Sequence, residues 1–212
     1  MRKIIILSLL FVCAMTTTAQ IDKNSRRIMT YKEFKPAAVT LLNNQVVTVP
    51  LANIFMKRST LVYHNIGGKN MEAKLSNVKS VDFDDRHYER IDTMLAWRVD
   101  TVGNNALFCV TKIDLSALRN NIINSRSMTN IELTNSLLNT ATLDVDMEDF
   151  DYPLINIYFY KYNDKMIPVQ EREMYRRIPK NKRYDFKVVT SLPTFSWTDP
   201  KSLLDLLKHI SD

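Results

Sequence analysis

Hydrophobic and polar positions change their pattern once along the chain, near residue 115. Between residues 38 and 115, β-branched and aromatic residues alternate with polar residues, and turn-forming residues interrupt them at short intervals. This alternation is typical of short antiparallel strands. We therefore expect an N-terminal antiparallel meander of several hairpins, with strands at 38–42, 45–49, 52–57, 60–65, 70–75, 78–83, 95–102 and 106–113.

The expected turns of this meander carry residues that tolerate positive φ angles. Asn43 and Asn44 separate the first two strands, and Gly103 lies between the last two. Such residues adopt the left-handed backbone of a tight hairpin at little cost. Each of these positions therefore indicates a hairpin connection.

After residue 115, helical patterns join the strands. We expect a helix over 116–125, strands at 130–133 and 141–145, and a late hairpin of 154–162 against 165–169 that turns at Asn163 and Asp164. Helices follow at 171–178 and 180–192. Because the strands come early and the helices late, the pattern favours an α+β fold.

The last element is expected to be an amphipathic helix. Thr198 or Asp199 can cap it, and Pro200 stands in its first turn. The apolar residues that follow recur at helical spacing, as Leu203, Leu204, Leu206, Leu207 and Ile210. This stripe predicts a helix that docks onto the sheet.

The first 19 residues have the pattern of an export signal. Arg2 and Lys3 precede a mostly apolar run over 4–15, and small residues at Thr17 and Ala19 mark a cleavage site before Gln20. A membrane anchor would need roughly 20 apolar residues, which is longer than this run. A lipidated Cys13 is the alternative, but the bulky Val12 before it disfavours lipidation.

Cleavage would leave one soluble protein in the periplasm or at the cell surface. We divide the chain into a signal peptide (1–19), a β-rich region (20–115) and an α+β region (116–212) that shares one core with it. Loss of Arg2 and Lys3 takes the 29 basic residues to 27, against 23 acidic ones, so the net charge of +6 becomes +4. This mild basicity identifies no partner. Cys109 would be the single cysteine left, and its apolar neighbours indicate a buried side chain.

Metal, nucleotide and catalytic patterns give no assignment. His64, His87 and His209 lack metal-ligand spacing, and no glycine-rich phosphate loop is present. We therefore predict no catalytic, cofactor-binding or metal-binding residues and no cofactor.

Two acidic clusters still deserve a test as sites. The first is Asp82, Asp84 and Asp85 with His87. The second is Asp144, Asp146, Glu148, Asp149 and Asp151. The second imitates the start of an EF-hand loop, but it lacks the glycine and the final glutamate of that loop. A carboxylate pair from either cluster would support the alternative function, a hydrolase such as a glycosidase.

A basic run surrounds Pro179 and consists of Arg176, Arg177, Lys180, Lys182 and Arg183. Export would exclude nucleic acid as its partner and leave an acidic glycan, a lipid headgroup or an envelope protein. The other interpretation is a solvated helix junction.

Several segments resemble uncharacterised exported proteins of the Bacteroidetes. These are the leader that ends at Gln20, the residues 52–55 (ANIF), 78–85 (VKSVDFDD) and 163–169 (NDKMIPV), and the Ile178–Pro179 step before the basic helix. The resemblance implies secretion and no known activity. We therefore expect a non-catalytic binding or structural module of the bacterial envelope, without a transmembrane segment in the mature chain.

Overall fold

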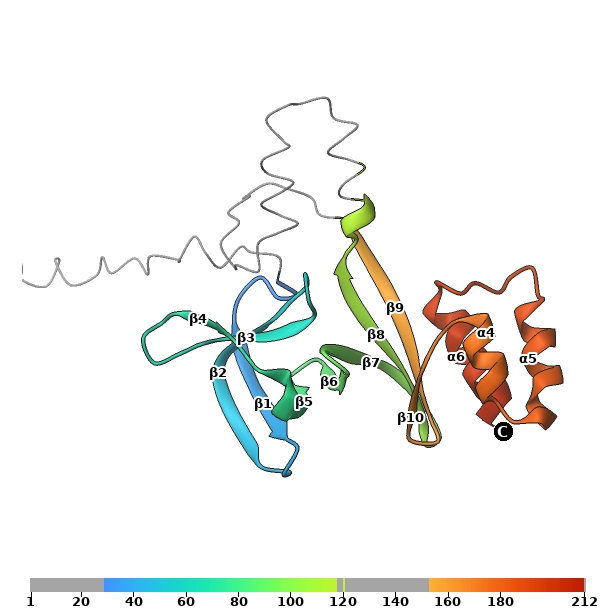
Figure 1. Ribbon diagram of the computed structural model, residues 1–212, viewed down its shortest axis with the longest axis horizontal. Coiled ribbons are helices and arrows are strands. Elements are labelled where there is room, and N and C mark those ends of the chain that lie inside the picture. Colours follow the sequence, from blue (N-terminus) through green and yellow to red (C-terminus); the bar gives the residue numbers. More distant parts are fainter. Residues whose placement is uncertain (1–28, 118–119, 121–152, 212) are drawn as a thin grey trace, which may run out of the picture.

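The computed structural model describes residues 29–117, 120 and 153–211. Within these ranges, ten strands form one antiparallel sheet in the order β10-β9-β8-β7-β6-β5-β1-β2-β3-β4 (Figure 1). The strands are β1 (Lys35–Leu41), β2 (Val46–Phe55), β3 (Thr60–His64), β4 (Asn70–Glu72), β5 (Val78–Asp82), β6 (His87–Ile91), β7 (Met94–Val102), β8 (Asn105–Ile113), β9 (Leu154–Tyr162) and β10 (Lys165–Pro168). The helices with assigned bounds are η2 (Leu75–Asn77), α4 (Glu171–Arg177), η3 (Lys180–Lys182), α5 (Arg183–Thr190) and α6 (Pro200–Ser211). A large antiparallel sheet followed by helices confirms the α+β class.

The hairpin turns use the residues that the sequence indicated. Asn44 has a φ angle of 63° between β1 and β2, and Gly103 has 57° between β7 and β8. Asn163 and Asp164 have φ angles of 47° and 60° between β9 and β10. Two consecutive positive φ angles match the right-handed twist of the strands they connect, so this short turn closes the late hairpin.

One pair of expected strands, 45–49 and 52–57, is a single strand in the structure. β2 pairs with β1 from Val46 onward and with β3 along Ala52–Phe55. The β1–β2 register shifts between Lys35 and Ala37, near Pro50. A proline is tolerated at such an irregularity because no ladder donor is needed there, so β2 continues through Pro50.

One further strand was not expected, and another is shorter than expected. β6 lies between β5 and β7, in a segment (HYERI) that we did not expect to be a strand. His87 and Glu89 lie on one face of this strand and form ion pairs, and the charged Arg90 follows on the other face, so the usual apolar alternation is hidden. β4 is shorter than expected because a 3-10 helix, η2, begins at Leu75.

The N-terminal half of the sheet curls so that the turn between β2 and β3 reaches β7. The backbone N–H of Leu95 donates to the Ser59 carbonyl (2.7 Å), and the Ser59 hydroxyl donates to the Leu95 carbonyl (2.6 Å). The N–H of Ile113 in β8 donates to the Met56 carbonyl (3.3 Å). Figure 1 shows the resulting shape, with β1 to β5 folded round on one side and the longer β7, β8 and β9 beside them.

The C-terminal helices pack against the β7–β9 part of the sheet (Figure 1). Asp199 caps α6, since its carboxylate accepts a hydrogen bond from the Ser202 N–H (3.0 Å). Tyr160 of β9 donates to the Leu203 carbonyl of α6 (2.6 Å), and Tyr162 donates to the Ile210 carbonyl (3.0 Å). The expected docking stripe is confirmed, with four fully buried residues, Leu203, Leu206, Leu207 and Ile210.

Two main hydrophobic cores lie side by side along the sheet. One lies inside the curled half and includes Ile54, Leu61, Val81 and Leu95. The other lies under the helices and includes Leu107, Tyr160, Phe186 and the α6 stripe. Trp97 of β7 packs against both cores. This side chain therefore marks the junction between the curled half and the helix-covered half.

Some expected elements lie outside the described residues. These are the signal peptide over 1–19, most of the helix over 116–125, and the strands at 130–133 and 141–145. Among the helices that the structure describes, none has the length and apolar character needed to cross a membrane.

Candidate functional site

The acids of the first cluster form ion pairs with basic side chains on both sides of the β5–β6 turn. His87 contacts the Asp82 carboxylate through Nδ1 and lies 3.5 Å from a Glu89 oxygen through Nε2. Lys161 of β9 contacts the same Glu89 at 3.0 Å. Asp82 and His87 are cross-strand partners, so the antiparallel pairing of β5 and β6 brings them together.

The other two acids of this cluster hold a lysine and a tyrosine. Lys35 contacts Asp84 at 3.1 Å and Asp85 at 3.5 Å. The Tyr31 hydroxyl donates to Asp85 (3.0 Å). Each carboxylate of the first cluster therefore has a cation within reach, an arrangement that stabilises the turn and leaves no carboxylate pair facing a cavity.

The ion pairs of His87 and Glu89 make the stability of the folded protein depend on pH. Each residue contributes in its own pH range. The hydrogen bond to Glu89, followed by that to Asp82, raises the pKa of His87 above its usual 6.5. The hydrogen bond to His87, followed by that to Lys161, lowers the pKa of Glu89 below its usual 4.5. The histidine contribution is complete below pH 6.5 and is lost as pH rises through its folded-state pKa. The glutamate contribution is present above pH 4.5 and is lost as pH falls through its own folded-state pKa.

We therefore expect His87→Gln to destabilise the protein more at about pH 5.5 than at about pH 8, measured as the midpoint of urea unfolding. The control is His209→Gln on the exposed side of α6, where Nδ1 contacts the Asp205 carbonyl within the same helix. Equal losses at both pH values for His87→Gln would contradict this account.

The remaining candidates of the sequence are not brought together. The second acidic cluster, from Asp144 to Asp151, lies outside the described residues. His64 stacks on Phe34, with 4.1 Å between ring centroids, far along the sheet from His209. Across residues 29–117, 120 and 153–211, no three His, Cys, Asp or Glu side chains converge as metal ligands would.

Cys109 is buried, as the sequence indicated. Its side chain is 1% exposed in the core under the helices. Burial raises the pKa of its thiol. A buried, protonated thiol is a poor nucleophile, so Cys109 acts as a small hydrophobic residue.

The basic run forms part of the α4–α5 surface. The Tyr175 ring has the Arg183 guanidinium 4.8 Å from its centroid and the Lys187 ammonium at 5.3 Å. Arg176 and Arg177 pair with Glu173 on their own helix. Several cations of this surface therefore already have a partner on the same surface, either the Tyr175 ring or the Glu173 carboxylate.

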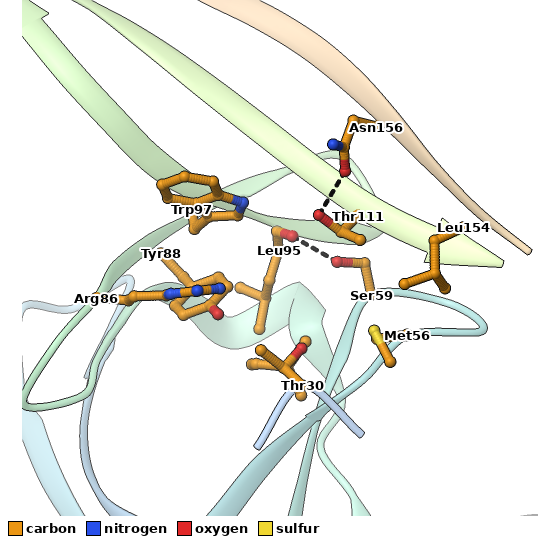
Figure 2. Close-up of a pocket in the computed structure, with 11 residues that line it drawn as sticks. Thr30, Met56, Ser59, Arg86, Tyr88, Leu95, Trp97, Thr111, Leu154 and Asn156 are labelled. Atoms are coloured by element: carbon orange, nitrogen blue, oxygen red, sulfur yellow. Dashed lines mark hydrogen bonds between the residues drawn. The ribbon is translucent and has the colours of Figure 1, made fainter. Parts of the chain in front are cut away.

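A cavity of about 430 Å³ lies where the curled half of the sheet meets β7, β8 and β9. Figure 2 shows that its wall combines side chains from the β2–β3 turn, from the β5–β6 turn, and from β6, β7, β8 and β9. Its volume falls in the range of small-molecule sites. The contact between Ser59 and Leu95, which closes the curl, lies in this wall.

Two polar atoms in the wall of the cavity are buried and unpaired. The Tyr88 hydroxyl and the indole nitrogen of Trp97 have no hydrogen-bond partner among the described residues. Tyr31 and Arg86 lie near the Tyr88 hydroxyl, and the Cys109 thiol lies near the Trp97 indole nitrogen, without reaching normal hydrogen-bond geometry. Burial raises the pKa of Tyr88, so its hydroxyl keeps the proton and can donate. Buried polar groups in folded proteins normally have partners, so these two atoms point to a missing one.

Arg86 adds a positive charge to the same wall. Its guanidinium lies 5.0 Å from the centroid of the Trp97 ring, and its Nε is 3.7 Å from an Asp85 oxygen. Figure 2 shows the guanidinium beside the Tyr88 ring, and the indole nitrogen of Trp97 on the ring edge nearest Thr111. Strand alternation places Tyr88 on the opposite face of β6 from His87 and Glu89. The cavity and the His87 ion pairs therefore lie on opposite sides of the sheet.

The sequence did not identify the residues of this cavity. It singled out Asp82, Asp84, Asp85 and His87 and passed over Arg86, which lies among them. The available signal was that Arg86, Tyr88 and Trp97, which all carry polar atoms, lie on or beside two strands that are adjacent in the sheet. These residues predict a cavity only if it is already known that β6 is a strand and that the sheet curls.

Comparisons of the chain with protein-family models, with curated proteins and with solved structures found no match. What the cavity binds must therefore be inferred from its own residues.

Proposed function

We propose that the chain is a non-catalytic binding module, and that the cavity at the junction of the two halves of the sheet is its ligand site. The observation that carries this proposal is the pair of buried, unpaired polar atoms, Tyr88 Oη and Trp97 Nε1, in the wall of the cavity. Leaving a buried donor without a partner costs about 1–3 kcal/mol, so a ligand that accepts these hydrogen bonds would recover that free energy on binding.

Binding is favoured over catalysis by the types of side chain that line the cavity. Its described lining contains an arginine, hydroxyls, an amide and apolar residues. A carboxylate-dependent hydrolase needs two acids that flank the reacting bond. The acids of the first cluster are instead held by Lys35 and His87, so within residues 29–117, 120 and 153–211 no observation favours the hydrolase alternative.

The test uses anilinonaphthalene sulfonate, a fluorescent aromatic anion, as the probe. We expect the wild-type protein to bind it with saturation and Arg86→Met to bind at least about tenfold more weakly, because a charge-assisted hydrogen bond contributes about 1.5–3 kcal/mol. Trp97→Phe, which removes the indole N–H and keeps an aromatic ring, should also weaken binding.

The matched control is Arg98→Met. Arg98 is exposed, lies next to Trp97 on β7 and faces the other side of the sheet. This variant loses the same charge but should bind the probe as the wild-type protein does. Equal weakening by Arg86→Met and Arg98→Met would show that the dye responds to net charge and would refute the site.

We also propose that the module is exported to the periplasm or cell surface of a bacterium, as in the Bacteroidetes proteins that the sequence resembles. The support is the pattern of residues 1–20, with Arg2 and Lys3 before an apolar run and small residues before Gln20. N-terminal sequencing of the protein from its native cells is expected to start at Gln20. A start at Met1 would refute export by cleavage.

A further inference from the structure

The charged and aromatic residues of the cavity wall offer hydrogen-bond donors. Arg86, Trp97 and Tyr88 all present N–H or O–H groups. Among the described lining residues there is no aspartate, glutamate or histidine. The nearby carboxylate of Asp85 is already engaged by Tyr31, by Lys35 and by the Nε of Arg86, whose terminal N–H groups stay on the cavity side.

The neutral polar residues of the wall already form hydrogen bonds with one another or with the backbone. Ser59 donates to the Leu95 carbonyl. Thr111 donates to the side-chain oxygen of Asn156 (2.8 Å), so that oxygen already has a partner. Figure 2 shows that the Thr111–Asn156 pair joins β8 to β9, and that the Ser59–Leu95 pair joins the β2–β3 turn to β7. The charge of Arg86, together with the N–H of Trp97 and the O–H of Tyr88, therefore favours an anionic ligand.

The rest of the wall is apolar. Ile54, Met56, Leu95 and Leu154 line the cavity, and Figure 2 shows Met56 and Leu154 on the side away from Arg86. A planar guanidinium matches the geometry of a carboxylate, with two parallel N–H groups facing two oxygens. Four aliphatic or thioether side chains match a short hydrocarbon chain, because burying each methylene contributes about 0.8 kcal/mol.

We infer that the ligand is a carboxylate joined to a short aliphatic chain, with its carboxylate at Arg86, Tyr88 and Trp97 and its chain against Ile54 and Leu95. This inference rests on the proposed function. Two sources share this chemistry, a short-chain fatty acid and the C-terminal residue of a peptide with an aliphatic side chain.

The experiment measures displacement of anilinonaphthalene sulfonate by two acids and their neutral amides. The pairs are hexanoate with hexanamide and acetyl-leucine with acetyl-leucinamide. We expect each acid to bind at least about tenfold more tightly than its amide. In Arg86→Met the acid and the amide should bind equally, whereas Arg98→Met should keep the preference. The acid that binds more tightly shows whether the ligand is a fatty acid or a peptide C-terminus.

The outcomes separate this inference from the proposed function. Saturable displacement by acids and amides with equal affinity would overturn the carboxylate class and leave the ligand site standing. A preference for the acid that persists in Arg86→Met would also overturn it, because the charge would then be bound elsewhere. Failure of the dye and of all four compounds to bind would overturn the proposed function itself.

Discussion

Replacing Leu207 with alanine is expected to lower the free energy of unfolding by about 2–5 kcal/mol. Leu207 is fully buried on α6, within the core that includes Leu107 and Tyr160 of the sheet. Alanine loses the transfer free energy of the removed carbon atoms and leaves a cavity between two packed layers. Urea denaturation measures the loss directly.

The same helix provides two controls for this substitution. Leu204 lies at the edge of the core and is half-buried, so Leu204→Ala should cost clearly less. Lys208 is exposed and pairs with Asp205 one turn before it, so Lys208→Ala should change stability by less than about 0.5 kcal/mol. Equal effects of Leu207→Ala and Lys208→Ala would mean that α6 is not docked on the sheet.

Asn53→Ala is expected to cost a similar amount, about 2–4 kcal/mol, through lost hydrogen bonds. Asn53 is fully buried in β2, where its side-chain oxygen accepts from the Tyr31 N–H (3.0 Å) and its amide donates to the Tyr31 carbonyl (2.9 Å). Removing the amide leaves both backbone groups of Tyr31 buried and unpaired. Thermal or urea unfolding should show the loss.

This substitution should also weaken the ligand site. The Asn53 bonds hold Tyr31, and with it the neighbouring Thr30, which lines the cavity. Probe affinity should therefore fall in Asn53→Ala even under conditions where the protein stays folded. Asn43→Ala provides the control, since Asn43 lies in an exposed turn and accepts one hydrogen bond there. If Asn53→Ala bound the probe as tightly as Asn43→Ala does, Thr30 would have no part in the site.

Local signals in the sequence were sufficient for the turns and for the last helix. Asn44, Gly103 and Asn163 have the positive φ angles expected of them, and Asp199 caps α6. These features depend on residues that are close together in the sequence. The same is true of the late hairpin, whose two strands are joined by two turn residues.

Signals that depend on distant pairing were missed or misread. The continuous β2 depends on β3 taking over from β1 as its partner at Ala52, and β6 is stabilised by ion pairs with Asp82 and Lys161. The cavity depends on a contact between Ser59 and Leu95, which are 36 residues apart. No short window of the chain contains that information.

The candidate acids illustrate the same difference. Their spacing in the sequence did indicate a cluster, and the structure does bring Asp84 and Asp85 to Lys35. The sequence could not show that these charges would be neutralised by a lysine about 50 residues away. It also could not show that Arg86, which directly follows Asp85, would turn to the opposite face and meet Trp97.

The most direct test of the ligand site is the indole N–H signal of Trp97 in an NMR titration with hexanoate. The chain contains two tryptophans, and Trp197→Phe assigns the remaining signal to Trp97. Because the Cys109 thiol beside the Trp97 indole N–H is at best a weak acceptor, a carboxylate that accepts this hydrogen bond should shift that signal, with saturation, while the Trp197 signal stays in place. An unchanged Trp97 signal, or equal and unsaturating drifts of both, would contradict the account.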